Sequence, residues 1–355
     1  MIIDKKSFGH LADGKEVFEF TLSNKSGMRV KVINFGGIIT SVLVPDRDGI
    51  FEDVVPGHDT LEDYLADPYY FGAIVGRHAN RIAEAKFILD GQQIRLNANN
   101  GNCHLHGGIV GFNKVFWDIE PIQNNDNQSL KLYYLSPDGE EGFPGNLSIT
   151  VIYTLTSQNE IVVDYSATTD KTTVLNLTQH SYFNLSAGKQ KDILSHELQL
   201  FASHFLPTNT DQIPTGERRS VEGSVFDFRS PKLIGRDIQL PDEQLILAIG
   251  YDHTWIIDHE TNLAKACCLT EPESGRRLEI FTTEPGVHFY SGNYLNCIGK
   301  GKNGQSYPFR YAMGLETQHF PNSVNEPSFP SVYLHPGEKF SSQTVYKFSV
   351  KSHNN

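Results

Sequence analysis

The sequence predicts an all-β protein, built as a single large antiparallel β-sandwich with few short helices. Residues that favour strands are abundant, because the chain has 22 Phe and 15 Tyr together with many Val, Ile and Thr. Several segments alternate apolar and polar residues with the period of two that a half-buried strand requires. Clusters of Gly, Asn, Asp and Pro, which are typical of turns, separate these segments. Together the three observations favour an antiparallel sandwich or barrel.

The clearest predicted strands are two neighbouring segments, residues 146–156 and 161–168. The first places five apolar side chains on one face: Leu147, Ile149, Val151, Tyr153 and Leu155. The second continues the alternation with four more: Ile161, Val163, Tyr165 and Ala167. Because only the polar residues 157–160 lie between the segments, we expect a β-hairpin with a short loop.

Shorter strands are expected along the rest of the chain, at residues 29–33, 38–44, 86–89, 93–96, 130–135, 278–283 and 345–350. Two brief helices are expected, at residues 60–66 and 242–248. Thr60 can cap the first of them, and Glu62 and Asp63 suit the positive end of its dipole.

The domain organisation follows from what the sequence lacks. It contains no repeat of fixed period, no low-complexity linker and no shift in composition that would mark a boundary. We therefore expect one domain over residues 1–355. Two sandwiches joined by an unrecognised linker are the alternative, since a chain of 355 residues is long enough for two domains.

The charge balance excludes some classes of partner. The chain carries 30 Lys and Arg against 42 Asp and Glu, a formal net charge of −12, which argues against nucleic-acid binding. No apolar run approaches the roughly 18 to 20 residues that span a bilayer, so no membrane association is expected. The first 16 residues are mixed and charged rather than signal-like. We expect a cytoplasmic protein, a monomer or weak dimer, whose four irregularly spaced cysteines are reduced.

Two segments in the first third of the chain place polar side chains where strands and turns ordinarily do not need them. Residues 76–82 contain Asn80 and Arg81, which are otherwise explained as a turn residue and a surface ion-pair partner. Residues 99–108 form a Gly- and Asn-rich loop with His104 and His106. The two histidines share one side of an extended chain, as metal ligands can, but no further ligands occur at useful spacing. We expect no metal.

Residues 176–185 carry a fully polar face if the segment is one extended strand. Its members are Asn176, Thr178, His180, Tyr182 and Asn184. A face with His and Tyr but no Lys or Glu is typical of the floor of a polar binding site. The structural alternative is a histidine satisfied within a polar network.

A fourth segment, residues 250–255, sets Asp252 among aromatic residues. Carbohydrate sites often combine a carboxylate with aromatic rings, although core packing with a capping Asp explains this short segment equally well.

The fifth segment, residues 310–321, contains Glu316. In a strand Glu316 shares a face with Ala312 and Gly314, whose small size leaves room for a ligand. A carboxylate buried there without a partner would cost several kcal/mol. Function is one reason to keep it, and a buried ion pair with Arg81 or Arg310 is the other. A histidine and a carboxylate facing a polar surface suit general acid–base catalysis without a cofactor.

The five segments together resemble the aldose 1-epimerase (galactose mutarotase) family. The motifs that carry the resemblance occur in the family's order: GRHANRI at 76–82, LHGG at 105–108, TQHSYFNL at 178–185, YSGN at 290–293 and LETQ at 315–318. The similarity runs from the first strands to residues 336–338. It implies the family's fold, a single large galactose mutarotase-like supersandwich with an open cleft on one sheet.

The resemblance also implies roles for individual residues. Glu316 corresponds to the general base that takes the proton from the anomeric hydroxyl, and His180 to the acid that protonates the ring oxygen. His106 matches a histidine that hydrogen-bonds near the ring oxygen. Four further substrate-binding candidates are Asn80, Arg81, Tyr182 and Asp252. Glu284 is a less certain one, since some family members have a Gln that contacts the anomeric region there.

The implied function is the interconversion of α and β anomers of free hexoses such as galactose and glucose, an isomerase reaction that needs no cofactor. Three alternatives stay open. A hexose-6-phosphate 1-epimerase would need a basic cluster for the phosphate, for which the site segments offer mainly Arg77 and Arg81. A non-catalytic sugar-binding module would not demand both a proton donor and an acceptor. A glycoside hydrolase would need two carboxylates, Glu316 with Asp252 or Glu284.

Overall fold

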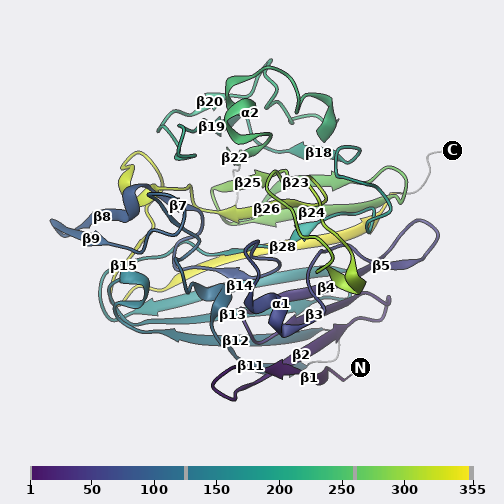
Figure 1. Ribbon diagram of the computed structural model, residues 1–355, viewed down its shortest axis with the longest axis horizontal. Helices are drawn as coiled ribbons and strands as arrows, with labels where there is room; N and C mark the ends of the chain where they lie inside the picture. The colour runs from purple at the N-terminus through teal and green to yellow at the C-terminus, as the bar shows by residue number, and fades with distance from the viewer. Residues whose placement is uncertain (1, 124–126, 259–261, 352–355) are drawn as a thin grey trace.

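The computed structural model describes residues 2–123, 127–258 and 262–351. It is built almost entirely of strands, with two short α-helices, and confirms the predicted antiparallel β-sandwich (Figure 1). Three larger sheets and four two-stranded ladders make up the fold, and every neighbouring pair of strands in them is antiparallel.

The largest sheet has nine strands and runs through the middle of the molecule (Figure 1). In spatial order they are β11 (Asp118–Gln123), β12 (Gln128–Ser136), β13 (Leu147–Leu155), β14 (Glu160–Thr169), β28 (Phe340–Val350), β24 (Arg276–Thr282), β23 (Ala264–Thr270), β18 (Glu197–Leu200) and β21 (Lys232–Leu233). The expected hairpin is β13–β14, in which Leu155 pairs with Ile161. The last strand, β28, is inserted between β14 and β24.

A six-stranded sheet carries most of the site described below. Its order is β17 (Tyr182–Phe183), β26 (Met313–Gln318), β25 (Gly286–Tyr290), β22 (Asp252–Ile256), β19 (His204–Leu206) and β20 (Arg219–Ser220). The N-terminal sheet has five strands in sequence order: β1 (Asp4–His10), β2 (Glu16–Ser23), β3 (Arg29–Ile33), β4 (Ile39–Pro45) and β5 (Phe51–Asp53).

The four small ladders connect loops around these sheets. They pair β6 (Ile74–Val75) with β16 (Thr178–Gln179), β7 (Arg81–Ile82) with β10 (His104–Leu105), β8 (Lys86–Leu89) with β9 (Gln92–Arg95), and β15 (Thr173–Val174) with β27 (Tyr333–Leu334).

Both predicted helices are present and capped. In α1 (Leu61–Leu65) the hydroxyl of Thr60 accepts from the backbone N–H of Asp63 at 3.2 Å, as the sequence predicts. In α2 (Glu243–Ala248) the carboxylate of Asp242 caps the first turn. Neither these helices nor any other helix in the described part of the chain has the length and apolar character to cross a membrane.

The core lies between the sheets because successive side chains of a strand point to opposite faces. On β26 the side chains of Met313 and Leu315 belong to the main apolar core, as do Val287 and Phe289 on β25. The intervening residues of both strands therefore face away from the core. Glu316 is one of these residues, so the predicted alternation along this segment is confirmed.

The prediction of one continuous strand over residues 176–185 is wrong. The chain pairs with β6 through β16, leaves that ladder at His180, and then pairs with β26 through β17. The step at His180 brings His180 and Tyr182 to the cavity described below, whereas Asn176 instead bonds the backbone of His319.

Candidate active site

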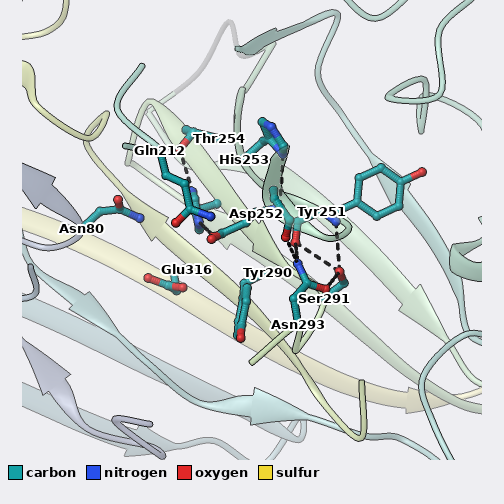
Figure 2. Close-up of polar contacts among 12 residues, drawn as sticks. Asn80, Gln212, Tyr251, Asp252, His253, Thr254, Tyr290, Ser291, Asn293 and Glu316 are labelled. Carbon is teal, nitrogen blue, oxygen red and sulfur yellow. Dashed lines mark hydrogen bonds and ion pairs between the residues drawn. The ribbon is translucent and has the colours of Figure 1, made fainter. Parts of the chain in front are cut away.

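A cavity of about 430 Å³ opens on the face of the six-stranded sheet that is turned away from the core. Its volume lies within the range of small-molecule sites, roughly 300 to 1,000 Å³. Seven of the eight side chains predicted for the site line it: Asn80, Arg81, His106, His180, Tyr182, Asp252 and Glu316. Figure 2 shows Asn80, Asp252 and Glu316 around one common space.

The cavity floor contains a buried acid–base pair. Nε2 of His180 lies 3.4 Å from Oε1 of Glu316, and the two side chains are 4% and 3% exposed. Glu316 is thus paired with a histidine rather than with Arg81 or Arg310. Within the described residues, Nδ1 of His180 and Oε2 of Glu316 are buried and have no hydrogen-bond partner. Since leaving such atoms unpaired costs about 1 to 3 kcal/mol each, they are expected to meet a polar ligand.

Small neighbours give Glu316 its space. A Cβ atom added at Gly314 would lie only 3.3 Å from Oε1 of Glu316, so glycine at this position leaves the carboxylate accessible. Aromatic rings surround His180, the partner of Glu316. The ring centroids of Tyr70, His106 and Tyr182 lie 5.8, 5.0 and 5.2 Å from that of His180.

His106 is held as a hydrogen-bond donor to the cavity. The backbone N–H of Asn80 donates to Nδ1 of His106 at 3.2 Å, and the backbone N–H of His106 donates to the carbonyl of Asn80 at 3.2 Å. Burial, together with the positive charges of His180 and Arg81, lowers the pKa of His106 well below its usual value. The neutral ring accepts at Nδ1, so its proton must be on Nε2.

Arg81 forms one side of the cavity and already has two partners. Its Nε donates to Oδ1 of Asn100 at 3.2 Å, and its Nη2 donates to Oε1 of Gln212. Gln212 in turn donates to the hydroxyl of Tyr294 at 3.3 Å. Gln212, which is labelled in Figure 2, therefore connects two other lining residues of the cavity, Arg81 and Tyr294.

Asp252 faces the cavity as an ionised carboxylate. Its Oδ1 accepts from Nε2 of His288 at 2.7 Å. Burial acts to raise the pKa of Asp252, but the hydrogen bond from His288 and the charges of His288 and Arg81 outweigh it, so the pKa is lowered. Asp252 is therefore suited to accept hydrogen bonds from hydroxyl groups.

Glu284, the eighth predicted residue, lies outside this cavity, so the structure does not bring it together with the other seven. Its Oε1 accepts from the hydroxyl of Ser342 at 2.5 Å and its Oε2 from Nδ1 of His319 at 2.5 Å. The carboxylate is buried in this separate network.

Nine lining residues were not among the predicted site residues, and five of them carry polar groups or rings that bear on the argument: Tyr70, Gln212, His288, Tyr290 and Tyr294. Strand alternation carries a signal for two of them, since His288 and Tyr290 alternate with the core residues Val287 and Phe289 on β25. Tyr70 and Gln212 lie in loops with positive φ, where no periodicity can indicate which way a side chain points.

The same cavity contains three potential metal ligands. Atoms of His106, His180 and Glu316 lie within 4.8 Å of one another. The tautomer of His106 disfavours a metal, because Nδ1 is occupied by the N–H of Asn80 and Nε2 carries the proton. A metal at Nε2 would move that proton to Nδ1, where it would oppose another donor.

Comparison with known proteins gives a consistent result over nearly the whole chain. The sequence profile of the aldose 1-epimerase family matches residues 19–347. The chain is 43% identical to galactose mutarotase of Bos taurus, covering 98% of this chain and 99% of that protein. It is 38% identical to aldose 1-epimerase of Escherichia coli K12, covering 95% and 96%.

Solved structures agree with this result. The aldose epimerase homologue from C. elegans superimposes with a TM-score of 0.87 at 30% identity, covering 94% of this chain and 99% of that one. Galactose 1-epimerase from Lactobacillus acidophilus also gives a TM-score of 0.87, at 29% identity and 99% coverage of both chains. The motifs, the sandwich and the cavity thus have a common explanation: this chain belongs to the aldose 1-epimerase family.

Proposed function

We propose that the protein is an aldose 1-epimerase, an isomerase that interconverts the α and β anomers of free hexoses such as galactose and glucose. The observation that carries the proposal is the buried His180–Glu316 pair, 3.4 Å apart at the floor of a polar cavity. Curated relatives at 38% to 43% identity named galactose mutarotase or aldose 1-epimerase support it.

The reaction begins with Glu316 ionised and His180 protonated. Glu316 takes the proton from the hydroxyl on C1, the C1–O5 bond breaks, and its electron pair goes to O5, which takes a proton from His180. Rotation of the free aldehyde about C1–C2 presents the other face of the carbonyl. On reclosure O5 attacks C1 and returns its proton to His180, while Glu316 returns its proton to O1. The protein ends as it began, and no cofactor is consumed.

The remaining lining residues bind and orient the sugar in this proposal. Nε2–H of His106 donates near the ring oxygen. Arg81 donates to sugar hydroxyls, and the carboxylate of Asp252 accepts from them. Asn80 contributes its amide and Tyr182 its ring.

Free sugars suit the cavity better than sugar phosphates do. Among the lining residues Arg81 is the only Lys or Arg, and it already serves Asn100 and Gln212. The other candidate, Arg77, is buried and donates to Ser136 and to the carbonyls of Pro137 and Pro144. A phosphate would therefore find Arg81 as its one cationic partner among the lining residues, and no basic cluster.

Glycoside hydrolysis is also disfavoured. A glycosidase needs one carboxylic acid kept protonated near neutral pH. Asp252 has a lowered pKa, and Glu284 lies outside the cavity. A non-catalytic sugar-binding module is disfavoured for a different reason. Binding alone does not require a proton donor, His180, next to a proton acceptor, Glu316.

We further infer that the chain forms one domain and acts in the cytoplasm as a monomer or weak dimer. The four cysteines are free and buried, which suits a reducing compartment. The nine-stranded sheet combines segments from residue 118 to residue 350, which supports a single folding unit.

Polarimetry on freshly dissolved α-D-galactose and α-D-glucose tests the function. Optical rotation is expected to relax faster with the protein than without it. The protein is expected to accelerate the relaxation of glucose 6-phosphate much less than that of the two free sugars. Relaxation of galactose and glucose at the spontaneous rate would contradict the proposal.

A further inference from the structure

His288 lines the cavity from β25. The register of the six-stranded sheet pairs His288 with Thr254 of β22 on one side and with Glu316 of β26 on the other. The three residues thus form one row across three strands, and His288 and Glu316 both line the cavity. The proposed reaction so far gives His288 no part.

Both ring nitrogens of His288 are already bonded. Nε2 lies 2.7 Å from Oδ1 of Asp252, and Nδ1 lies 2.9 Å from Oγ1 of Thr254. Since a carboxylate only accepts, the proton of the neutral ring is on Nε2. The hydroxyl of Thr254 donates to Nδ1 of the neutral ring and accepts from it if the ring is protonated. No nitrogen is therefore left to exchange a proton with a sugar.

Asp252 is held at two points. Its backbone N–H donates to Nδ1 of His253 at 3.1 Å, and Nε2 of His253 lies 3.2 Å from Oε1 of Gln244. His288 holds the carboxylate through Oδ1. No described residue forms a hydrogen bond to Oδ2, which is available to a substrate hydroxyl.

We propose that His288 is a positioning residue, which orients the carboxylate of Asp252 toward a sugar hydroxyl and so sets the affinity for the sugar rather than the rate of proton transfer. This inference rests on the proposed function, because it concerns the same cavity. The titratable groups around His288 are Asp252, Glu316, His106 and His253. Of these, Asp252 is the one that bonds it.

The test is a set of variants with separate measurement of KM and kcat for galactose. His288→Leu is expected to raise KM about 10- to 100-fold, the effect of losing a hydrogen bond to a charged group, with kcat changed less than about threefold. His288→Gln places an amide N–H near the position of Nε2 and is expected to restore KM to within about threefold of wild type. Asp252→Ala and the double variant with His288→Leu are expected to have equal KM values, because His288 acts through Asp252.

Three outcomes would overturn the inference: a fall in kcat at unchanged KM, no rescue by His288→Gln, or additive effects of the two substitutions in the double variant. Thermal unfolding of each variant, with the exposed His335→Gln as a matched control, separates misfolding from altered binding. If His288→Leu does not fold, Thr254→Val together with His288→Gln decides the question: the Val variant is expected to raise KM and the Gln variant to leave it near wild type.

Equilibrium binding of galactose by calorimetry separates this inference from the proposed function. A wild-type protein that binds galactose without accelerating anomer exchange would refute the function, and the same variants compared by dissociation constant would still decide the role of His288.

Discussion

Replacing Glu316 by Gln is expected to remove catalysis while keeping the fold. The substitution preserves the volume of the side chain. Among the described residues no group forms a hydrogen bond to Oε2 of Glu316, so replacing this oxygen by an amide leaves no such group unpaired. The ion pair with His180 is the contact that it removes. General base catalysis contributes about 10²- to 10⁴-fold to a rate, which corresponds to about 2.7 to 5.4 kcal/mol of activation free energy. We expect kcat to fall by about three orders of magnitude.

The assay is polarimetry of fresh α-D-galactose with wild-type and Glu316→Gln protein at equal concentration. Thermal unfolding is the control, and the melting temperature is expected not to fall, because an uncharged amide is less costly to bury than a carboxylate. A variant that keeps more than a tenth of the wild-type rate would refute the assignment of Glu316 as the base. A variant that has lost both rate and stability would refute the argument that the buried carboxylate serves function rather than folding.

Three further predictions concern other residues. Burial acts to lower the pKa of His319, but the charge and the hydrogen bond of Glu284 outweigh it and raise the pKa. The contribution of this pair to the free energy of unfolding should therefore be full below the unfolded pKa of about 6.5 and lost as pH rises through the higher folded pKa. Urea unfolding at about pH 6 and pH 8.5 measures this contribution, and in His319→Gln the difference between the two pH values should be smaller by that amount. Gly107→Ala is expected to destabilise the fold by about 3 kcal/mol or more, since φ is +88° and the added Cβ would lie 1.8 Å from the carbonyl oxygen of Gly76; an unchanged urea midpoint would contradict this. Arg81→Lys is expected to raise KM for galactose about tenfold, because a single ammonium cannot replace the fork of donors, and steady-state kinetics with an unchanged KM would exclude Arg81 from sugar binding.

Strand alternation accounts for most of what could be predicted from the sequence. The segment around Glu316 shows why: Met313 and Leu315 must enter the core, so Glu316 must face away from it. The same rule locates the hairpin β13–β14, and the side chain of Thr60 locates the first helix. These features depend on residues within one turn or one hairpin.

The errors arise where the structure depends on contacts between distant segments. Residues 176–185 look like one strand, but the chain changes partner at His180: residues 178–179 pair with β6 and residues 182–183 with β26. Glu284 has the chemistry of a ligand-binding residue, yet His319 and Ser342, distant in sequence, bind its carboxylate. Alternation along β25 indicates that His288 faces away from the core, but its place between Thr254 and Glu316 depends on the register between strands that are distant in sequence.

The position of β28 in the middle of the nine-stranded sheet has a consequence for synthesis of the protein. Glu160 on β14 pairs with Lys347 on β28, so the sheet closes only after nearly two hundred further residues have left the ribosome. Until then β14 and β24 each present an open edge, and open edges invite pairing with other chains. Nascent chains stalled before residue 340 should therefore depend on chaperones, and deleting β28 should yield aggregate rather than a smaller sandwich.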